Sequence, residues 1–275
     1  MKINFFKYQG AGNDFVIVDN RLNNLSFSSN QINEICDRKY GVGGDGFILL
    51  NNHNKFDFEM KYFNSNGEIS SMCGNGARCV VHLAYTLKII KSSTEFLAAD
   101  GPHKAKVKNE SSIIISMNDI HQISTNEKYS LINSGSPHHI IEKTNIKSIN
   151  VNEVGSKIRY SKKYHPSGVN VNFIKKNSSK EFEIRTYERG VEKETLSCGT
   201  GAVASAIAMH SLGRTSNNKI RILTAGGRLY ISFKFEGHYS EIFLEGPVKK
   251  VYIGQINLWW RLNLEIWKAL TLKFY

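Results

Sequence analysis

The stretch MCGNGARCVVHLA at residues 72–84 returns in altered form as SCGTGAVASAIAM at residues 197–209. This places Cys73 and Cys198 125 positions apart, each in front of a glycine-rich turn. The same offset separates three further pairs of like residues, namely Gly10 and Gly135, Tyr62 and Tyr187, and Gly101 and Gly226. Several matches in a single register predict a chain made of two structurally equivalent halves.

Each half combines short strand patterns with one helical pattern. Alternating or β-branched runs bounded by Gly, Asn and Ser predict strands in hairpins. These runs are FFKY (5–8), DFVIVD (14–19), FDFEMKYF (56–63), HHIIE (138–142), VNFIKK (171–176) and FEIRTY (182–187). Helices are predicted over about 75–90 and 199–212, and the second is apolar on nearly every face, so it should be buried. The expected fold is α/β (α+β), with two pseudo-symmetric halves, each a curved, mostly antiparallel sheet or barrel around a central helix.

A polar stretch without periodicity near residues 116–130 marks the expected boundary. The predicted halves are residues 1–118, which carry Cys73, and residues 119–254, which carry Cys198, with an active site in the cleft between them. The segment 255–275 lies outside the repeat and is expected to complete the N-terminal half. Its apolar helical stripe, interrupted by charges, favours docking on the core or on a second subunit over membrane binding. The stripe consists of Trp259, Leu262, Ile266 and Leu270.

Composition narrows the class of protein. The chain has 275 residues and a formal net charge of +12, but its basic residues occur as scattered pairs such as Lys162-Lys163 and Lys249-Lys250. This scatter indicates a solvated surface and no nucleic-acid partner. No signal peptide and no apolar run long enough to span a membrane is evident, and four cysteines favour free thiols in a reducing cytoplasm. We expect a cytoplasmic protein without a membrane partner.

A cysteine at the mouth of a helix has distinctive chemistry. The unpaired backbone N–H groups and the helix dipole there favour an anion, so they should lower the pKa of a thiol. The backbone N–H groups of Gly74, Asn75, Gly199 and Thr200 could likewise bind a carboxylate. For either cysteine alone, a buried free thiol beside a glycine-rich loop is an equally good interpretation. Matching positions in both halves favour a function.

Other uses of the thiols fit less well. A zinc site needs paired ligands, whereas Cys198 has no neighbouring ligand, so no metal is expected. A cysteine hydrolase could recruit His138 or His139 but has no need of a second, symmetric cysteine. Two thiols on opposite faces of a carbon centre can remove a proton from one face and deliver one to the other. No motif for pyridoxal phosphate or a nucleotide is evident, so the sequence predicts a cofactor-independent racemase or epimerase.

Several motifs together resemble the diaminopimelate epimerase family. They are GAGNDFVIVD (10–19), YGVGGDGFIL (40–49), FNSNGE (63–68), MCGNGARC (72–79), GVNVNFI (168–174), YERGVEKETLSCGTGA (187–202) and GGRL (226–229). The resemblance implies interconversion of LL- and meso-2,6-diaminopimelate for lysine and peptidoglycan synthesis, by a homodimer with its site between two halves. Proline racemases share the two-cysteine plan but have His where this chain has Asn75. A non-catalytic amino acid binding protein on the same fold is the alternative from another class.

The resemblance also implies roles for individual residues. Cys73 and Cys198 would be the acid–base pair, while Gly74, Asn75, Gly199 and Thr200 hold the carboxylate of the reacting end. The distal end of the substrate would be sorted by Asn13, Asn64, Asn170, Glu188 and Arg189. His138 and Glu188 would tune the thiols. Two departures affect substrate contacts: Ser136 stands where many members have Asn, and Gly46 stands where some have Gln.

Overall fold

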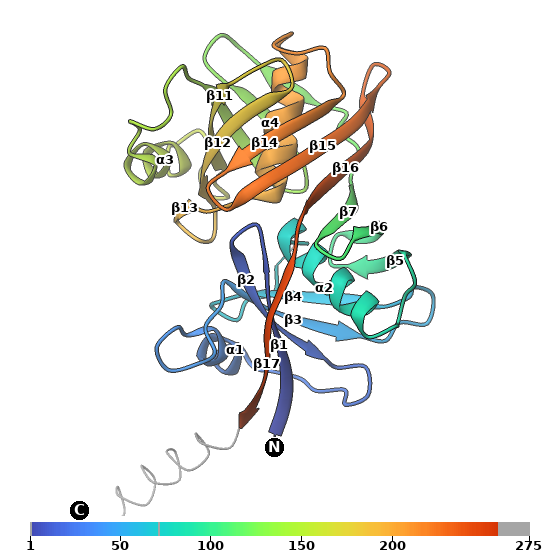
Figure 1. Ribbon diagram of the computed structural model, residues 1–275. Helices are drawn as coiled ribbons and strands as arrows, with labels where there is room; N and C mark the ends of the chain where they lie inside the picture. Colours follow the sequence, from blue (N-terminus) through green and yellow to red (C-terminus); the bar gives the residue numbers. More distant parts are fainter. Residues whose placement is uncertain (1, 71, 258–275) are drawn as a thin grey trace, which may run out of the picture.

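The computed structural model describes residues 2–70 and 72–257, and its two halves stand one above the other (Figure 1). The first half contains β1 (Lys2–Gly10), β2 (Asn13–Asp19), α1 (Ser29–Cys36), β3 (Gly46–Asn51), β4 (Glu59–Asn64), α2 (Gly74–Thr86), β5 (Ser93–Ala98), β6 (Gly101–Asn109) and β7 (Ser112–Met117). The chain continues through β8 (Ile123–Thr125), β9 (Ser130–Asn133), β10 (Pro137–Glu142), α3 (Val151–Arg159), β11 (Asn170–Lys176), β12 (Glu181–Glu188) and β13 (Lys193–Thr195). It ends with α4 (Gly199–Ser211), β14 (Lys219–Thr224), β15 (Gly227–Phe235), β16 (Tyr239–Pro247) and β17 (Lys249–Asn257).

The order of strand pairing repeats between the halves, as the repeated sequence predicts. In the first half β2–β3 and β4–β5 are parallel, while β3–β4, β5–β6 and β6–β7 are antiparallel. In the second half β10–β11 and β12–β14 are parallel, while β11–β12, β14–β15 and β15–β16 are antiparallel. Because β7 also pairs with β16, the two half-sheets join into one curved sheet (Figure 1). The predicted fold class is confirmed.

The two central helices are equivalent in position. Helix α4 begins and ends 125 positions after α2. Every residue of α4 from Ala202 to Met209 is buried, as expected for a helix without a polar face. Both helices contribute to one apolar core that includes Phe15, Val80 and Ile207. Burial of each such large side chain contributes roughly 1.5–3 kcal/mol, so the core ties the two helices to their sheets.

Two boundaries differ from the expected ones. Helix α2 ends at Thr86 instead of continuing to about residue 90, because Leu87 caps it and Lys88 takes a positive φ of 59°. Strand β4 begins at Glu59, three residues after the start of the predicted run, because the residues before it form a bend. Neither change moves a residue of the predicted site.

The C-terminal part of the chain returns to the first half. Strand β17 leaves the upper half and runs antiparallel to β1, with Lys2 opposite Asn257 (Figure 1). The first residues of the predicted completing segment, 255–257, belong to this strand. The apolar stripe from Trp259 to Leu270 lies outside the described residues.

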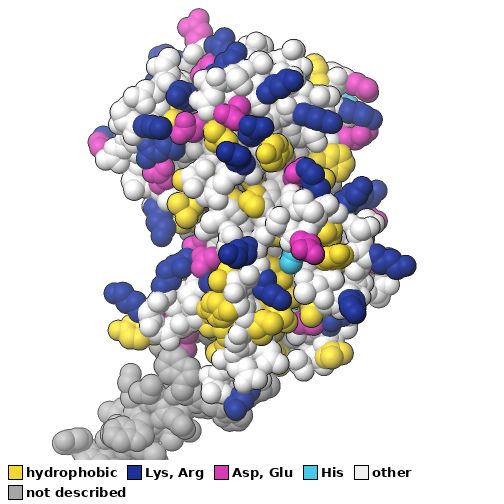
Figure 2. All heavy atoms as spheres, viewed as in Figure 1, with side chains coloured by type: hydrophobic (Ala, Val, Ile, Leu, Met, Phe, Trp, Pro, Cys, Tyr) yellow, Lys and Arg dark blue, Asp and Glu magenta, His cyan; other side chains and the backbone are white. Residues whose placement is uncertain are grey.

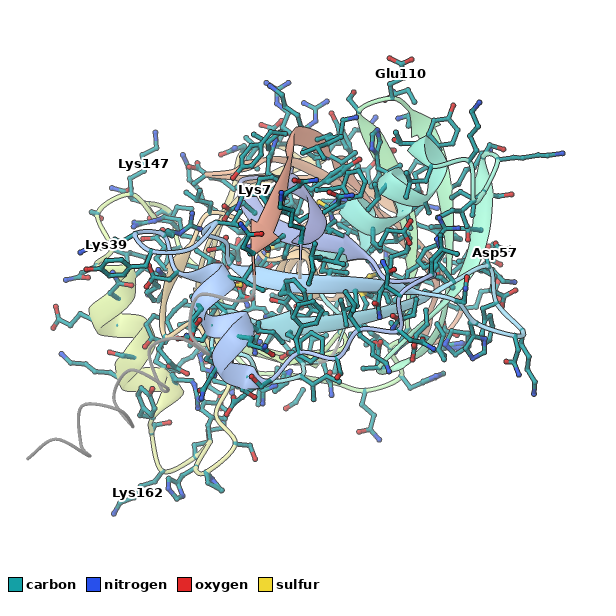
Figure 3. All side chains as sticks on the ribbon, turned by 90° about the horizontal axis from the view of Figure 1, so that it is seen from below. Lys7, Lys39, Asp57, Glu110, Lys147 and Lys162 are labelled. Atoms are coloured by element: carbon teal, nitrogen blue, oxygen red, sulfur yellow. The ribbon has the colours of Figure 1, made fainter. Side chains whose placement is uncertain are left out.

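The surface carries its charge in a dispersed way. Figure 2 shows Lys and Arg side chains scattered over both halves on the visible face, without a continuous basic stripe. In Figure 3, Lys39, Lys147 and Lys162 project outward, whereas Lys7 lies inside the molecule and pairs with Asp14 at 2.7 Å. Within the part of the chain that the structure describes, none of the helices combines the length and the apolar character needed to cross a membrane.

Candidate active site

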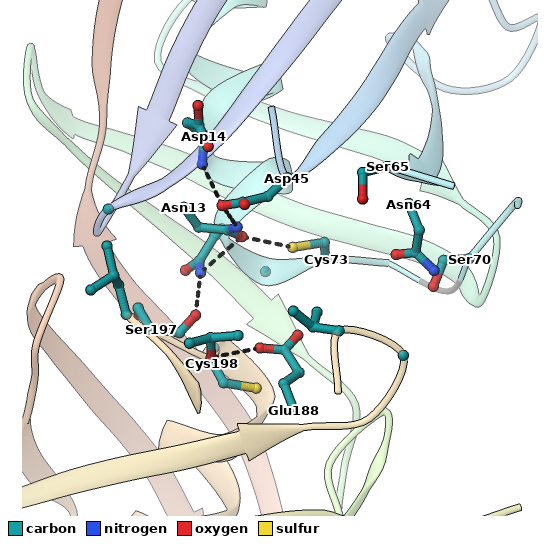
Figure 4. Close-up of a pocket in the computed structure, with 18 of the residues that line it drawn as sticks. Asn13, Asp14, Asp45, Asn64, Ser65, Ser70, Cys73, Glu188, Ser197 and Cys198 are labelled. Atoms are coloured by element: carbon teal, nitrogen blue, oxygen red, sulfur yellow. Dashed lines mark hydrogen bonds between the residues drawn. The ribbon is translucent and has the colours of Figure 1, made fainter. Parts of the chain in front are cut away.

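A cleft of about 770 Å³ lies where the two halves meet. Its wall includes residues from both, among them the ends of β1, β4 and β12 and the starts of α2 and α4. Eleven of the predicted site residues line it, namely Asn13, Asn64, Cys73, Gly74, Asn75, Asn170, Glu188, Arg189, Cys198, Gly199 and Thr200. His138 is buried behind this wall. Figure 4 shows the side chains of Cys73 and Cys198 reaching the same pocket from the two halves.

The two helix N-termini meet at a pair of glycines. A Cβ atom built on Gly199 would lie 3.5 Å from the Cα of Gly74, and one on Gly74 would lie 3.8 Å from the Cα of Gly199. Both would press against Leu244 Cδ2 at 3.0 Å, so the Leu244 side chain would have to move to admit a larger residue at either position. Cys73 and Cys198 are the N-cap residues of α2 and α4. The glycines therefore bring the two thiols and the N–H groups of two helix starts to one place.

The hairpin between β1 and β2 carries Asn13 to the thiol of Cys73. Ala11 and Gly12 both have positive φ, which gives the tight two-residue turn that suits a twisted hairpin. Asn13 Nδ2 donates to Asp45 Oδ2 at 2.6 Å, so its Oδ1 faces the other way. That oxygen accepts from Asn75 Nδ2 at 3.4 Å and lies 3.8 Å from Cys73 Sγ (Figure 4). Because a carboxylate can only accept, Asp45 fixes the orientation of the Asn13 amide.

Cys198 has a different set of partners. Its Sγ accepts from the backbone N–H of Gly201 at 3.4 Å and lies 3.4 Å from Thr200 Oγ1. Thr200 Oγ1 in turn lies 2.9 Å from His138 Nε2, and His138 Nδ1 lies 2.9 Å from Asn172 Nδ2. With Asn172 donating to Nδ1, the imidazole proton resides on Nε2 and is donated to Thr200. The Thr200 hydroxyl is then free to donate to the sulfur.

The sequence predicts lowered pKa values for both thiols. This prediction is wrong, because burial raises both. Desolvation raises the pKa of Cys73 to about 11, against the opposing effect of the N–H groups of Gly76 and Asn75. Desolvation also raises the pKa of Cys198, and the neighbouring carboxylate of Glu188 adds to the rise. The helix N-termini do favour the thiolates, but removal of water from the buried sulfurs outweighs them. Both cysteines are thiols at neutral pH in this state.

Two ionisable groups flank Cys198. Burial, together with the charge of Arg189, lowers the pKa of His138 to about 3, so the imidazole is neutral. Burial raises the pKa of Glu188 to about 7, although Thr195 Oγ1 donates to its Oε2 at 2.9 Å. The charge of Glu188 in turn raises the pKa of the Cys198 thiol. Glu188 is therefore a carboxyl group that can take up or release a proton near neutral pH beside a thiol.

A hydrogen-bonded group in the wall of the cleft contains Arg189, Asn170 and Ser136. Asn170 Nδ2 donates to Ser136 Oγ at 2.8 Å, and its Oδ1 accepts from the backbone N–H of Arg189 at 2.8 Å. Arg189 Nη2 also donates to Ser136 Oγ, at 3.2 Å. Within residues 2–70 and 72–257, no carboxylate is paired with the Arg189 guanidinium. Ser136 therefore links two predicted site residues.

Asn64 and Gly46 lie on paired strands of the first half. Asn64 ends β4, and its backbone closes the turn to Gly67 at 2.9 Å. A Cβ on its strand partner Gly46 would lie 2.5 Å from the Tyr62 ring, so the position has no room for a longer side chain.

Four residues that hydrogen-bond to predicted site residues were not predicted from the sequence. Asp45 and Thr195 orient Asn13 and Glu188, Asn172 holds His138, and the fully buried Arg78 binds Asn75. All four lie inside the motifs that carry the family resemblance, and this membership was the available signal. Within the described residues, no group of three or more His, Cys, Asp or Glu side chains could hold a metal ion.

Solved structures share this architecture. A phenazine biosynthesis protein of the PhzF family from Bacillus anthracis aligns with a TM-score of 0.74 at 15% identity, covering 94% of this chain and 100% of that one. A probable proline racemase from Agrobacterium radiobacter aligns with a TM-score of 0.72 at 12% identity, covering 93% of each chain. At this identity the likeness concerns the fold. It defines the fold class, a two-half α+β architecture with one central helix in each half.

Sequence comparison gives the particular family. The diaminopimelate epimerase profile matches residues 5–122 and 130–251. Diaminopimelate epimerase from Flavobacterium psychrophilum is 47% identical over 249 residues, which span 90% of this chain and 97% of that relative. The enzyme of the same name from Chlorobaculum tepidum is 37% identical over 256 residues, covering 90% of this chain and 99% of the relative. The chain belongs to the diaminopimelate epimerase family.

Proposed function

We propose that this isomerase interconverts LL- and meso-2,6-diaminopimelate by a two-base reaction of Cys73 and Cys198, without a cofactor. The observation that carries the proposal is the pair of N-cap thiols that line one cleft at the meeting point of α2 and α4. In one direction a thiolate removes the α-proton, so that the C–H bond breaks and an S–H bond forms. The opposite thiol delivers its proton to the other face, and the two sulfurs exchange protonation states.

The backbone N–H groups at the two helix starts would hold the α-carboxylate and stabilise charge that spreads into it. Gly74, Asn75, Gly199 and Thr200 provide these groups, and the absence of side chains at the glycines leaves the backbone accessible. Glu188, with its pKa near 7, would accept the proton of Cys198 and so prepare the thiolate. Arg189 has no carboxylate partner in the described part of the chain and is held by Ser136, so it would bind the distal carboxylate, with Asn13, Asn64 and Asn170 around the same end.

The proposal extends to the assembly and setting of the enzyme. A homodimer is favoured by the apolar surface of β17, where Val251, Tyr252 and Ile253 are 50%, 45% and 57% exposed. Hydrophobic side chains gather over the lower half in Figure 2, where β17 and β1 run. Sedimentation should give twice the chain mass, and a fully active monomer would contradict this part. The reaction would serve lysine and peptidoglycan synthesis in the cytoplasm.

The deciding experiment is incubation of the protein with LL-diaminopimelate in D₂O. We expect deuterium at one α-carbon by NMR, together with accumulation of the meso isomer. A binding protein would shift the substrate resonances without exchange, and a proline racemase would exchange proline instead. Either result would overturn the proposal. Two thiols facing one pocket favour the epimerase, because binding alone requires neither.

A further inference from the structure

Arg78 is the buried cation of the first half. Its side chain is 0% exposed, on the face of α2 that points into the core. Nη2 donates to Asn75 Oδ1 at 2.6 Å and Nη1 to the carbonyl oxygen of Gly74 at 3.1 Å. Nε is buried and has no hydrogen-bond partner among the residues that the structure describes. The fold makes room for this group, because a Cβ on Gly246 would lie 2.9 Å from its Cζ.

No anion in the described residues balances this charge. No carboxylate pairs with Arg78, and the groups whose negative charge would act on it are the thiols of Cys79 and Cys73. Cys79 is fully buried and its pKa is raised by burial, so it stays neutral. Burial lowers the pKa of Arg78 to about 10, which still leaves the guanidinium charged at neutral pH. An uncompensated buried charge is costly, so it requires an explanation.

The two hydrogen bonds of Arg78 go to Asn75 and Gly74, which lie at the start of α2 next to Cys73. Arginine can only donate, so its bond to Asn75 Oδ1 turns Asn75 Nδ2 toward Asn13 Oδ1 and the carbonyl oxygen of Ser197 at 3.1 Å. Asn75 thereby spans the two halves at the base of the cleft. The equivalent position of the second half, 125 residues later, is Val203, so the fold itself does not require a cation there.

We infer that Arg78 is a positioning residue of the Cys73 site, which fixes the amide of Asn75 and supplies the positive charge that an anion at the start of α2 neutralises. That anion is the Cys73 thiolate or the carboxylate of the substrate. The inference deepens the proposed function and rests on it for the substrate. The effect on Cys73 can be measured without any substrate. Arg78 thus makes the two thiols unequal.

Other charges also act on Cys73. The carboxylate of Glu188 on β12 raises its pKa, and the thiol of Cys198 and the phenol of Tyr62 face it from α4 and β4. Cys79 lies on the same helix as Arg78. None of these groups is positive, so the guanidinium is the charge whose removal should disfavour the thiolate.

The test is alkylation by iodoacetamide over a pH series, with the Cys73 and Cys198 peptides quantified by mass spectrometry. In Arg78→Met we expect the pKa of Cys73 to rise by about one. At a pH below that pKa the thiolate fraction then falls about tenfold, and Cys73 should react about tenfold more slowly. Cys198 in the same sample should react as in the wild type. Arg78→Lys keeps the charge and should restore the Cys73 rate. Val203→Met, the matched change on α4, should alter neither thiol.

Three results would overturn the inference. The first is a wild-type Cys73 rate in Arg78→Met. The second is a result that excludes a local effect of the positive charge on Cys73. Such a result would be an equal change in rate at both thiols, or an Arg78→Lys variant that reacts as slowly as Arg78→Met. The third is failure of Arg78→Met to fold while Val203→Met folds, because a guanidinium needed for folding is a structural group. A failed D₂O exchange would count against the proposed function and leave the alkylation result standing.

Discussion

The Cys73 and Cys198 sites occupy equivalent places in two halves of one fold, yet their surroundings differ in almost every chemical respect. At the same offset of 125 residues, the twins are Asn13 and His138, Asn75 and Thr200, Asp45 and Asn170, Phe63 and Glu188, Asn64 and Arg189, and Arg78 and Val203. The glycines that bring the helices together are retained in both. The repeat therefore preserves the geometry that two faces of one carbon require, while substitution gives each thiol its own polar network.

The consequence of this difference is a division of tasks. The first half has a buried cation, oriented amides and Asp45 around Cys73. The second half has a carboxyl group with a pKa near 7 and a neutral histidine around Cys198. One site is tuned by fixed charge and the other by a group that exchanges protons. The following changes test whether the halves are as unequal as their contacts indicate.

Removal of either sulfur should have the largest effect. Cys73→Ala and Cys198→Ala should each reduce epimerisation more than about a thousandfold, because neither thiol can serve both faces of the α-carbon. The measurement is conversion of LL- to meso-diaminopimelate, with circular dichroism to verify folding. Cys79→Ala, a fully buried thiol on α2, is the matched control and should remain active. Near-wild-type turnover in either of the first two variants would contradict the two-base reaction.

Removal of the Glu188 carboxyl should act mainly through Cys198, although its charge also raises the pKa of Cys73. Since its pKa is raised to about 7, Glu188 is protonated below that pH and becomes a base for Cys198 above it. Wild-type kcat/KM should therefore rise as the pH passes through about 7. Glu188→Gln should lower kcat/KM about a hundredfold and lose this limb of the pH profile. Glu192→Gln, which breaks an ion pair with Arg159 in the same turn, should keep the limb. If kcat/KM of Glu188→Gln still rises as the pH passes through about 7, the titrating group is not Glu188.

Arg189 distinguishes the halves at the distal end of the substrate. Arg189→Lys should raise KM for diaminopimelate about tenfold with a smaller change in kcat, because a point charge cannot reproduce the planar fork. Asn64→Ala, at the twin position, should raise KM less, since no charge is lost. Steady-state kinetics of both variants provide the comparison. Lysine lacks the distal carboxylate and should be a poor substrate. Equal rates of epimerisation for lysine and diaminopimelate would show that Arg189 does not bind the distal carboxylate.

The duplicated architecture could be predicted from the sequence because a repeat in one register constrains both halves at once. The helix starts at Gly74 and Gly199 agree with the expected ones within one residue. The end of α2 could not be predicted, because Lys88 reverses the chain without a glycine or proline to mark it. The return of β17 to β1 joins residues 255–257 to residues 2–4, and no local pattern encodes a pairing of that span.

The polar networks were less predictable than the positions of the residues in them. A motif indicates that Asn13 and Asn75 are present, but which way each amide points depends on hydrogen bonds to Asp45 and Arg78 that form only in the folded chain. The thiol pKa values were predicted with the wrong sign for a related reason. The helix N-terminus is visible in the sequence, whereas the loss of water around Cys73 and Cys198 arises only when both halves close over the sulfurs.

The smallest expected effect concerns the polarity of the Cys73 network. Asp45 stands where the second half has Asn170, and as a carboxylate it holds Asn13 in one orientation. Asp45→Asn makes the two halves alike at this position and supplies an amide that can donate as well as accept, so Asn13 can turn its Nδ2 toward the sulfur. We expect kcat/KM to fall about fivefold, the rate equivalent of one hydrogen bond of about 1 kcal/mol.

Asp14→Asn is the control for this change, because Asp14 belongs to the same ion network through Lys7 and Arg38 but its side chain does not contact Asn13. It should leave kcat/KM near the wild-type value. If both variants lose the same activity, the ion network as a whole, and not the orientation of one amide, supports Cys73. If neither loses activity, Asn13 keeps its orientation through Asn75 alone, and the donor that fixes the network is then Arg78, on the opposite side of Asn13 from Asp45.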